Sequence, residues 1–261
     1  MVFKKLMQAA GVGGPQVETV LHSSSVKPGG TVTGEVTLIG GKHDSDIKGV
    51  YLALKTRVEV ESGDSEHRAD LEYAKMPIAG SFELDDDARY SIPFEMPIPW
   101  EAPITHFYGR PLIGTTVGVA TELEVARAVD ATDLDPIQVH PLPAQERLLT
   151  AFANLGFRYH SADCEKGRIW GVKQQLPFYQ EIEFYPPPQY SRGIKELEVT
   201  FVAGPTSMEV VLELDKRGGA FTEGHDSFSR FVVEYATVEQ TDWEKQLDGF
   251  LQQAGKRKGF F

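Results

Sequence analysis

The sequence contains a single cysteine, Cys164, among its 261 residues. One cysteine cannot form an internal disulfide, so cross-links are excluded as a source of stability, and this usage is typical of the reducing cytoplasm. The neighbouring Asp163 and Glu165 add negative charge, which disfavours the thiolate that a cysteine nucleophile needs. We therefore expect Cys164 to be inert and side-chain packing to hold the fold together.

Long apolar runs are also missing. No stretch reaches the roughly 18 consecutive apolar residues of a membrane-spanning helix. The lysine-bearing start MVFKKLMQAAGVGG lacks the apolar core of a signal peptide. We expect a cytoplasmic protein that is neither secreted nor membrane-spanning.

Positive charge is scarce. Lysine and arginine number 26 against 38 acidic residues, which gives a formal net charge of −12. Nucleic-acid binders use basic side chains to displace counterions from phosphates, so we expect no nucleic-acid partner. Hydrophobic residues at 41% and charged residues at 25% are ordinary for a globular chain, and the sequence therefore predicts a folded protein.

The common catalytic and cofactor motifs are absent. The sequence has no Walker-type phosphate loop, no GxSxG serine elbow and no HExxH zinc motif. His160 and Cys164 would supply two zinc ligands where a structural site takes four. Glu181 and Glu183 alternate along one predicted strand about 7 Å apart, but any sheet exposes such pairs. We expect no cofactor and no enzymatic activity.

The first half of the chain contains segments in which apolar and polar residues alternate. Apolar residues recur there at every second position between turn-forming segments rich in glycine and proline, which predicts half-buried strands of a mainly antiparallel sheet. The residues expected to face the core include Val32, Val36, Leu38, Val50, Leu52, Leu54, Val58 and Val60.

The second half predicts further strands between two helices. A short helix at 144–155 ends at Gly156, and strands follow as EIEFY, KELEVTFVA, SMEVVLEL and SRFVVEYA. The tail has an apolar stripe and a capping-box pattern of Thr241 with Glu244, which predict an amphipathic C-terminal helix. The expected fold is all-β, with two tandem immunoglobulin-like β-sandwiches at 1–135 and 136–240, and the helix with its basic tail at 241–261.

Three aspartates lie where the two predicted domains join: Asp130, Asp133 and Asp135. Carboxylate oxygens are the ligands that calcium prefers, so these residues are weak candidates for a metal site. Neither a glycine nor a glutamate is spaced as in an EF-hand loop, and aspartate is as common in turns. Both interpretations stay open, and the prolines at 136, 141 and 143 predict a restricted connector.

Several segments together resemble one known family. They are the N-terminal FKK, PGGTVTGEVTLIGG, PIPWEAPIT, DATDLDPIQVHPLP, LGFRYHSADCE, LPFYQEIEF and FSRFVVEY. In this order they resemble the bacterial sporulation-control proteins, which have an arrestin-like fold of two β-sandwiches, and the resemblance covers nearly the whole chain. It implies a non-catalytic adaptor that regulates sporulation or stress responses by binding other proteins.

Candidate contact residues for a protein partner lie in the proline-rich loop and at the C-terminal end: Pro97, Pro99, Trp100, Trp243, Phe250, Lys256, Arg257 and Lys258. The C-terminal helix is suited to docking on its own domain, on a partner groove or peripherally on an anionic membrane. The alternative function is a β-sandwich carbohydrate-binding module or enzyme, because sugars stack on aromatic residues such as Trp100, Trp170, Tyr179 and Tyr190.

Overall fold

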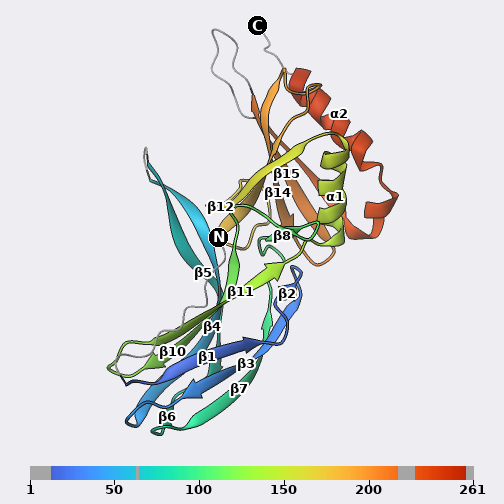
Figure 1. Ribbon diagram of the computed structural model, residues 1–261. Coiled ribbons are helices and arrows are strands. Elements are labelled where there is room, and N and C mark those ends of the chain that lie inside the picture. The colour runs from blue at the N-terminus through green and yellow to red at the C-terminus, as the bar shows by residue number, and fades with distance from the viewer. Residues whose placement is uncertain (1–12, 63–64, 217–226, 257–261) are drawn as a thin grey trace. The chain divides into compact units, whose positions relative to one another are not determined.

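The computed structural model describes residues 13–62, 65–216 and 227–256 (Figure 1). The chain forms two compact units, and each unit combines separate segments of the sequence. Unit 1 comprises Met1–Val58, Arg68–Thr105 and Thr116–His140, and unit 2 comprises Glu59–His67, His106–Thr115 and Pro141–Phe261. The continuous domain bounds expected from the sequence stay a prediction.

Unit 1 is built from two β-sheets. The first has three antiparallel strands in the order β1-β3-β7, namely β1 (Gln16–Leu21), β3 (Thr31–Ile39) and β7 (Arg89–Pro97). The second contains β4 (Ser45–Ser62), β10 (Val117–Val125) and β11 (Ala131–Val139), with β5 (Ser65–Ala79) and β6 (Phe82–Leu84) paired to β4 and β2 (Ser25–Val26) parallel to β11. The core lies between the sheets, as the alternating burial along β3 and β10 shows.

The predicted core positions of unit 1 are confirmed with one exception. Val32, Val36, Leu38, Val50, Leu52, Leu54 and Val58 are all buried. Each such side chain stabilises the fold by about 1.5–3 kcal/mol relative to exposure. Val60 is only half-buried, and Glu59 is buried instead. The reason is that β4 passes from unit 1 into unit 2 after Val58, where Glu59 lies beside Glu165.

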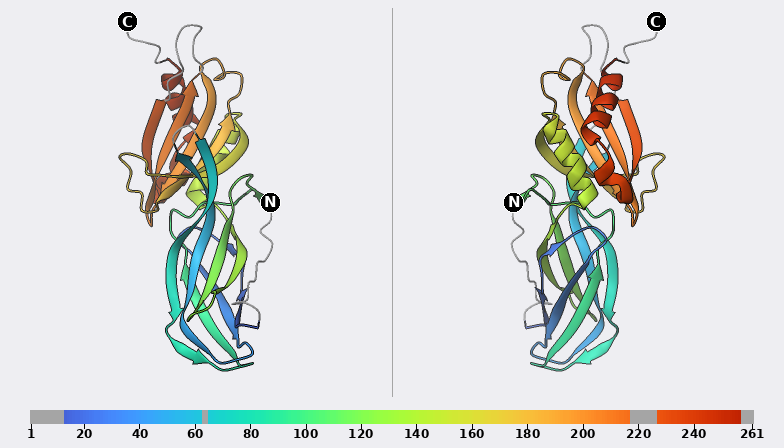
Figure 2. Two further views of the ribbon diagram at one scale, coloured as in Figure 1. Left: turned by 90° about the vertical axis from the view of Figure 1, so that its left-hand side faces the viewer. Right: turned by 90° about the vertical axis from the view of Figure 1, so that its right-hand side faces the viewer.

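Unit 2 is a sheet covered by helices on one face. In the described residues its antiparallel strands follow the order β12-β13-β14-β15-β16, with bounds Arg158–Lys166, Phe178–Tyr185, Ile194–Ala203, Ser207–Lys216 and Ser227–Glu234. Helices α1 (Pro143–Asn154) and α2 (Trp243–Lys256) lie across the same face, and the 3₁₀ helix η1 (Tyr235–Gln240) leads into α2 (Figure 2). The short strands β8 (His106–Phe107) and β9 (Arg110–Pro111) form a hairpin.

Helix α1 agrees with the predicted helix at 144–155. The side-chain oxygen of Gln145 accepts a hydrogen bond from the backbone N–H of Leu142, and Gly156 follows the helix with a positive φ of 91°. On the buried side of α1, Phe152 stacks on Phe184 of β13 with ring centroids 5.8 Å apart. The apolar stripe predicted from the sequence therefore packs against the sheet.

Helix α2 docks on its own unit. Glu244 accepts hydrogen bonds from the two terminal nitrogens of Arg147 in α1, at 3.0 and 2.8 Å. The Arg147 guanidinium lowers the pKa of Glu244 to about 2. The predicted capping box is wrong, because Asp242 Oδ1 accepts the N–H of Lys245 and Thr241 bonds to the preceding turn.

The predicted all-β class is confirmed, as are the short helix that opens the second half and the C-terminal helix. Within the described part of the chain, no helix is long and apolar enough to cross a membrane.

Candidate functional site

The sheet of unit 2 has two chemically different faces. Because side chains alternate along a strand, Ile182, Val199 and Leu212 share the face that the helices cover, and all three are buried. In the left view of Figure 2 the helices lie behind the strands. The opposite face, here called the acidic face, carries Asp163 and Glu165 on β12, Glu181 on β13, Glu198 on β14 and Glu213 on β15.

Several of these acids are direct neighbours across the strands. Asp163 is opposite Glu181, and Glu198 is opposite Glu213. Like charges directly opposite each other destabilise a sheet by roughly 0.2–1 kcal/mol per pair. Natural sequences break such local rules mainly at functional sites. The acidic face is therefore the first place in this chain to look for function.

A hollow of about 620 Å³ opens on the acidic face. Glu181, Glu198 and Glu213 line it from three adjacent strands, and we call it the acidic hollow. Trp170, from the segment between β12 and β13, and Phe228, on β16, also line it with 94% and 65% of their surface exposed. Large aromatic side chains on the surface beside a hollow are typical of binding sites.

The segment that carries Trp170 is held in place by a buried glutamine. Gln174 is 8% exposed, and its side-chain nitrogen donates to the carbonyl oxygens of Gly167, Leu176 and Phe178 at 2.8–3.0 Å. Its side-chain oxygen accepts the N–H of Ile169 at 2.9 Å. The backbone around Trp170 is thus fixed, while the indole itself is left on the surface.

The sheet of unit 2 also binds the segment that carries Trp170. Glu209 on β15 accepts the backbone N–H of Lys173 at 3.0 Å and lies 4.0 Å from the Arg230 guanidinium. Gly171 has a φ of 81°, and a Cβ atom there would come within 2.6 Å of Arg230. The positive φ favours glycine at this position, whereas the flexible end of the Arg230 side chain could move away from a Cβ atom.

Crowding of carboxyl groups changes their protonation. Burial, with the charges of Glu198, Asp163, Glu213 and Glu165, raises the pKa of Glu181 to about 9. Burial, together with a hydrogen bond that the protonated Asp163 carboxyl donates to Glu183, raises the pKa of Asp163 as well. Glu181 therefore keeps its proton at neutral pH, and a cation beside it would favour release of that proton.

The acidic face also brings carboxylate oxygens to the spacing of metal ligands. Within each of three groups of described residues, one ligand atom per residue lies within 4.8 Å of the others. The groups are Asp163, Glu165 and Glu181; Glu181, Glu198 and Glu213; and His160, Glu183 and Glu196. A calcium ion takes six to eight oxygen ligands, so each carboxylate triad supplies only part of a coordination shell.

The hinge aspartates lie in unit 1, and two of them bind backbone groups. Asp133 is 2% exposed, and its carboxylate accepts the N–H groups of Thr19 at 2.7 Å and Leu134 at 2.9 Å. Because Thr19 is on β1 and Asp133 is on β11, this carboxylate ties the two sheets together. Asp130 accepts the N–H of Val125 at 3.0 Å. Asp135 follows on β11, and metal binding by the three residues stays a prediction.

The candidate residues of the proline-rich loop also lie in unit 1. Pro97 is exposed at the end of β7, whereas Pro99 and Trp100 are half-buried. The Trp100 ring covers Gly29, where an added Cβ would be 2.6 Å from the ring. Trp100 therefore packs on its own unit, and partner contact by this loop stays a prediction.

The candidate residues of the C-terminal helix are partly used for docking. Trp243 is buried and donates its indole N–H to the carbonyl of Val238 at 2.8 Å. Phe250 is half-buried and stacks on Phe231 of β16 with ring centroids 5.2 Å apart. The basic candidates lie beyond the described side chains: Lys256, Arg257 and Lys258.

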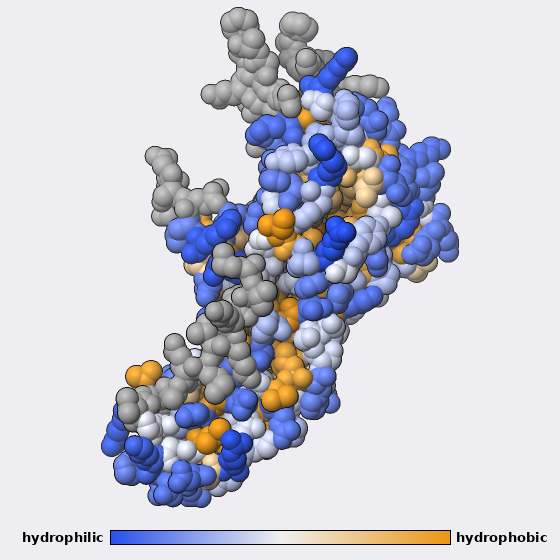
Figure 3. Space-filling view, viewed as in Figure 1, coloured by the Kyte–Doolittle hydropathy of each residue, from blue (hydrophilic) through white to orange (hydrophobic). Residues whose placement is uncertain are grey.

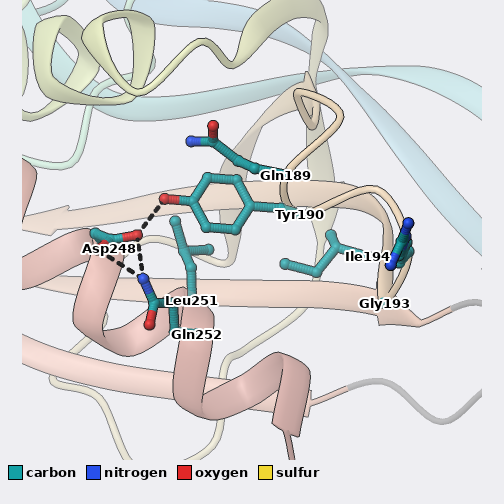
Figure 4. A pocket seen from close by; sticks show the side chains of 8 residues that line it. Gln189, Tyr190, Gly193, Ile194, Asp248, Leu251 and Gln252 are labelled. Atoms are coloured by element: carbon teal, nitrogen blue, oxygen red, sulfur yellow. Dashed lines mark hydrogen bonds between the residues drawn. The ribbon is translucent and has the colours of Figure 1, made fainter.

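A second hollow of about 560 Å³ lies beside α2 (Figure 4). Tyr190 donates its hydroxyl hydrogen to Asp248 at 2.5 Å, and Gln252 donates to the same carboxylate at 2.9 Å. Burial and Asp248 raise the pKa of Tyr190 to about 12. These groups satisfy one another and join α2 to the β13–β14 connection, so we interpret this hollow as structural.

The aromatic residues considered for sugar stacking fall in different places. Trp170 and Tyr179 line the acidic hollow, Tyr190 lines the second hollow, and Trp100 belongs to unit 1. On the face shown in Figure 3, apolar residues form separate small patches among polar ones. Sequence reasoning named Glu181 but missed Glu198 and Glu213, although glutamates two or four residues apart on three successive strands were a usable signal.

The fold and the chemistry of its sheets define the class of protein. It is an all-β protein of two compact units, and the sheet of unit 2 has helices on one face and acidic side chains on the other. A family model described as Spo0M, SpoOM protein, matches residues 3–218. The chain therefore belongs to the Spo0M family of sporulation-control proteins.

A relative and a solved structure, both of Bacillus subtilis origin, agree with this assignment. The sporulation-control protein spo0M of Bacillus subtilis strain 168 is 36% identical over 216 residues, which span 82% of this chain and 81% of the relative. The crystal structure of Spo0M from Bacillus subtilis aligns with a TM-score of 0.80 at 30% identity, over 93% of this chain and 100% of that one. Squid arrestin aligns over 88% of this chain and 78% of its own at 11% identity, with a TM-score of only 0.30.

Proposed function

We propose that this chain is a non-catalytic, arrestin-like adaptor that acts in the cytoplasm, and that it regulates sporulation by binding another protein through the acidic face of unit 2. Membership of the Spo0M family supports a role in sporulation control. The observation that carries the binding surface is Trp170, which is almost fully exposed on a segment fixed by Gln174 at the rim of the acidic hollow.

Docking through this face agrees with the way the rest of unit 2 is used. Helices α1 and α2 occupy the other face, where Trp243 and Phe250 pack against their own unit. Aromatic side chains have few rotatable bonds, so they lose little conformational freedom on binding and are common anchors of protein interfaces. The acidic hollow offers two such aromatic side chains, Trp170 and Phe228, beside half-buried carboxyl groups.

Sugar binding is the second candidate function, because Trp170 and Tyr179 line the same hollow. Half-buried carboxyl groups are hydrogen-bond acceptors for hydroxyls, and aromatic rings stack on sugar faces. A glycan array distinguishes the two candidates. Binding of defined glycans that is lost in Trp170→Ala supports the sugar site, and an array without hits removes it.

A genetic test addresses the adaptor. The gene for this chain is deleted in its own bacterium, and the strain is complemented with wild-type protein, with Trp170→Ala/Phe228→Ala, or with the control Glu35→Gln/Glu95→Gln, which alters two exposed strand residues of unit 1. We expect spore counts to return to normal with the wild type and the control and to stay at the deletion level with the hollow variant. Full rescue by the hollow variant, at equal protein level, contradicts the proposed surface.

A further inference from the structure

The acidic hollow combines two features that point to one kind of ligand. Three carboxyl groups, those of Glu181, Glu198 and Glu213, converge on it from neighbouring strands within 4.8 Å of one another. Trp170 and Phe228 expose their rings beside these carboxyl groups. Carboxylates attract any cation, but aromatic faces add attraction only for organic cations such as guanidinium and ammonium groups.

The volume and the surrounding charge agree with a side chain as ligand. About 620 Å³ is within the range of sites that enclose a small organic group. Arg168 and Arg230 also line the hollow, yet Arg168 donates to the Gln174 carbonyl at 3.1 Å and Arg230 lies toward Glu209 at 4.0 Å. Glu165 and the carboxyl group of Asp163 extend the acidic surface on the adjoining strand, so acids outnumber bases at this surface.

We propose that the acidic hollow binds a basic peptide segment of the partner protein, with an arginine or lysine side chain held between the carboxyl groups of Glu198 and Glu213 and the ring of Trp170. This inference rests on the proposed adaptor function and adds the chemistry of the partner. Phe228 lies at the edge strand β16, where the peptide backbone on either side of the basic side chain would pass.

Protonation of the hollow supports the same ligand. The groups that face Glu181 are Asp163 and Glu165 on β12, Glu198 on β14 and Glu213 on β15, and Arg168 and Arg230 line the same hollow. Burial, together with the repulsion from these acidic neighbours, keeps a proton on Glu181 at neutral pH. An arriving guanidinium relieves this repulsion and replaces the proton, so the site is prepared for a cation before the partner arrives.

The test uses the full-length chain and two short fluorescent peptides in a polarisation titration. The first peptide alternates arginine with glycine, and the second replaces each arginine by citrulline, which keeps the shape and removes the charge. We expect the arginine peptide to bind at least about tenfold more tightly, because only the arginine peptide can form charge-assisted hydrogen bonds with the carboxyl groups.

Variants locate the binding site. Glu198→Gln/Glu213→Gln should weaken binding of the arginine peptide about tenfold. Trp170→Ala should weaken it about threefold, the size of a surface cation–π contact. Glu35→Gln/Glu95→Gln removes the same charge from unit 1 and should leave affinity within about twofold, which separates the hollow from the general attraction of an acidic protein. Thermal melts confirm that each variant is folded.

Three outcomes overturn the inference. They are equal affinity for the two peptides, an equal loss in the hollow and control variants, and calcium binding at the hollow in calorimetry without any peptide binding. If the hollow is still required for spore formation in those cases, the adaptor proposal stands and only the basic segment is wrong. If the hollow is not required for spore formation, the adaptor proposal itself fails.

Discussion

Glu198 and Glu213 face each other directly across the β14–β15 ladder, and the carboxyl group of Glu181 on β13 lies within 4.8 Å of both. Such an arrangement destabilises the free protein, because like charges repel most strongly where water is partly excluded. It becomes favourable when a cation sits among the carboxyl groups. Stability and binding are therefore opposed at this surface, and the following predictions depend on that opposition.

Stability should decrease as the pH rises through the alkaline range. The pKa of Glu181 is raised from an ordinary value of 4.5 to about 9, so its contribution is fully present below 4.5 and is lost as the pH rises through 9. The raised pKa of Asp163 acts with the same sign. Thermal melts between pH 5 and pH 9 should show a falling Tm, and Glu181→Gln should flatten the slope. A wild-type Tm that rises over this range contradicts the protonation described here.

Binding of the arginine peptide should strengthen over the same pH range. Arginine stays charged throughout, whereas Glu181 must lose its proton when the guanidinium arrives. Titrations at pH 6 and pH 8.5 should give tighter binding at the higher pH for the wild type and a weaker pH dependence for Glu181→Gln. Calorimetry in two buffers of different ionisation enthalpy should also detect proton release. Affinity that falls with pH in the wild type would count against the role of Glu181.

The pair Arg147 and Glu244 should stabilise the docking of α2 with the opposite pH dependence. The pKa of Glu244 is lowered to about 2, so the contribution is present above 4.5 and is lost as the pH falls through 2. A double-mutant cycle with Arg147→Ala and Glu244→Ala should give a coupling of about 1 kcal/mol at pH 7, because the pair is bidentate but partly exposed. A coupling indistinguishable from zero shows that packing alone holds the helix.

Gln174→Ala should loosen the segment that carries Trp170. The substitution leaves three carbonyl groups and one N–H without the side-chain partner they have now, at about 1–3 kcal/mol for an unsatisfied buried group. Amide hydrogen exchange should increase in residues 167–178 and peptide affinity should fall. Gln175→Ala is the matched control, since that neighbouring side chain is exposed. Unchanged exchange in Gln174→Ala would show that the segment is fixed by other contacts.

Asp133→Asn should destabilise unit 1 by about 1.5–3 kcal/mol, because the new amide turns one of two carboxylate acceptors into a donor. Asp130→Asn should have little effect, since its amide oxygen still accepts the N–H of Val125. The measurement is chemical denaturation of both variants. A calcium-dependent rise in the wild-type Tm that is lost in both variants would favour the metal interpretation of the hinge instead.

Alternation of apolar residues was sufficient to predict the class of fold and most of its core. Val36, Leu38, Leu52 and Leu54 are buried because one face of a strand in a two-layer unit must be apolar. The pattern fails at Val60, where β4 leaves one unit and enters the other. No local periodicity carries that information, because it depends on which segments pack together.

The acidic hollow could be predicted only in parts. Glu181 was visible as one of an alternating pair, but its closeness to Glu198 and Glu213 depends on the register of three strands, which no local pattern shows. The exposure of Trp170 depends on the buried Gln174, whose five hydrogen bonds cannot be inferred from residue spacing. Arg168 donates to the backbone carbonyl of Gln174, and four backbone groups bond to the Gln174 side chain. Similarly, Asp242 caps the N-terminus of α2, because Glu244 binds Arg147 of α1 instead of taking part in the cap.

Site-specific photocrosslinking is the most direct measurement of where the chain meets its partner. A photoreactive amino acid replaces Phe228 at the hollow or Glu95 in unit 1, and sporulating cells are irradiated. We predict an adduct heavier than the 28.9 kDa chain from position 228 alone. It should disappear when Glu198→Gln/Glu213→Gln is combined with the probe or when the arginine peptide is added to permeabilised cells. An adduct from position 228 that survives both changes, or one that forms only from position 95, contradicts docking at the acidic hollow.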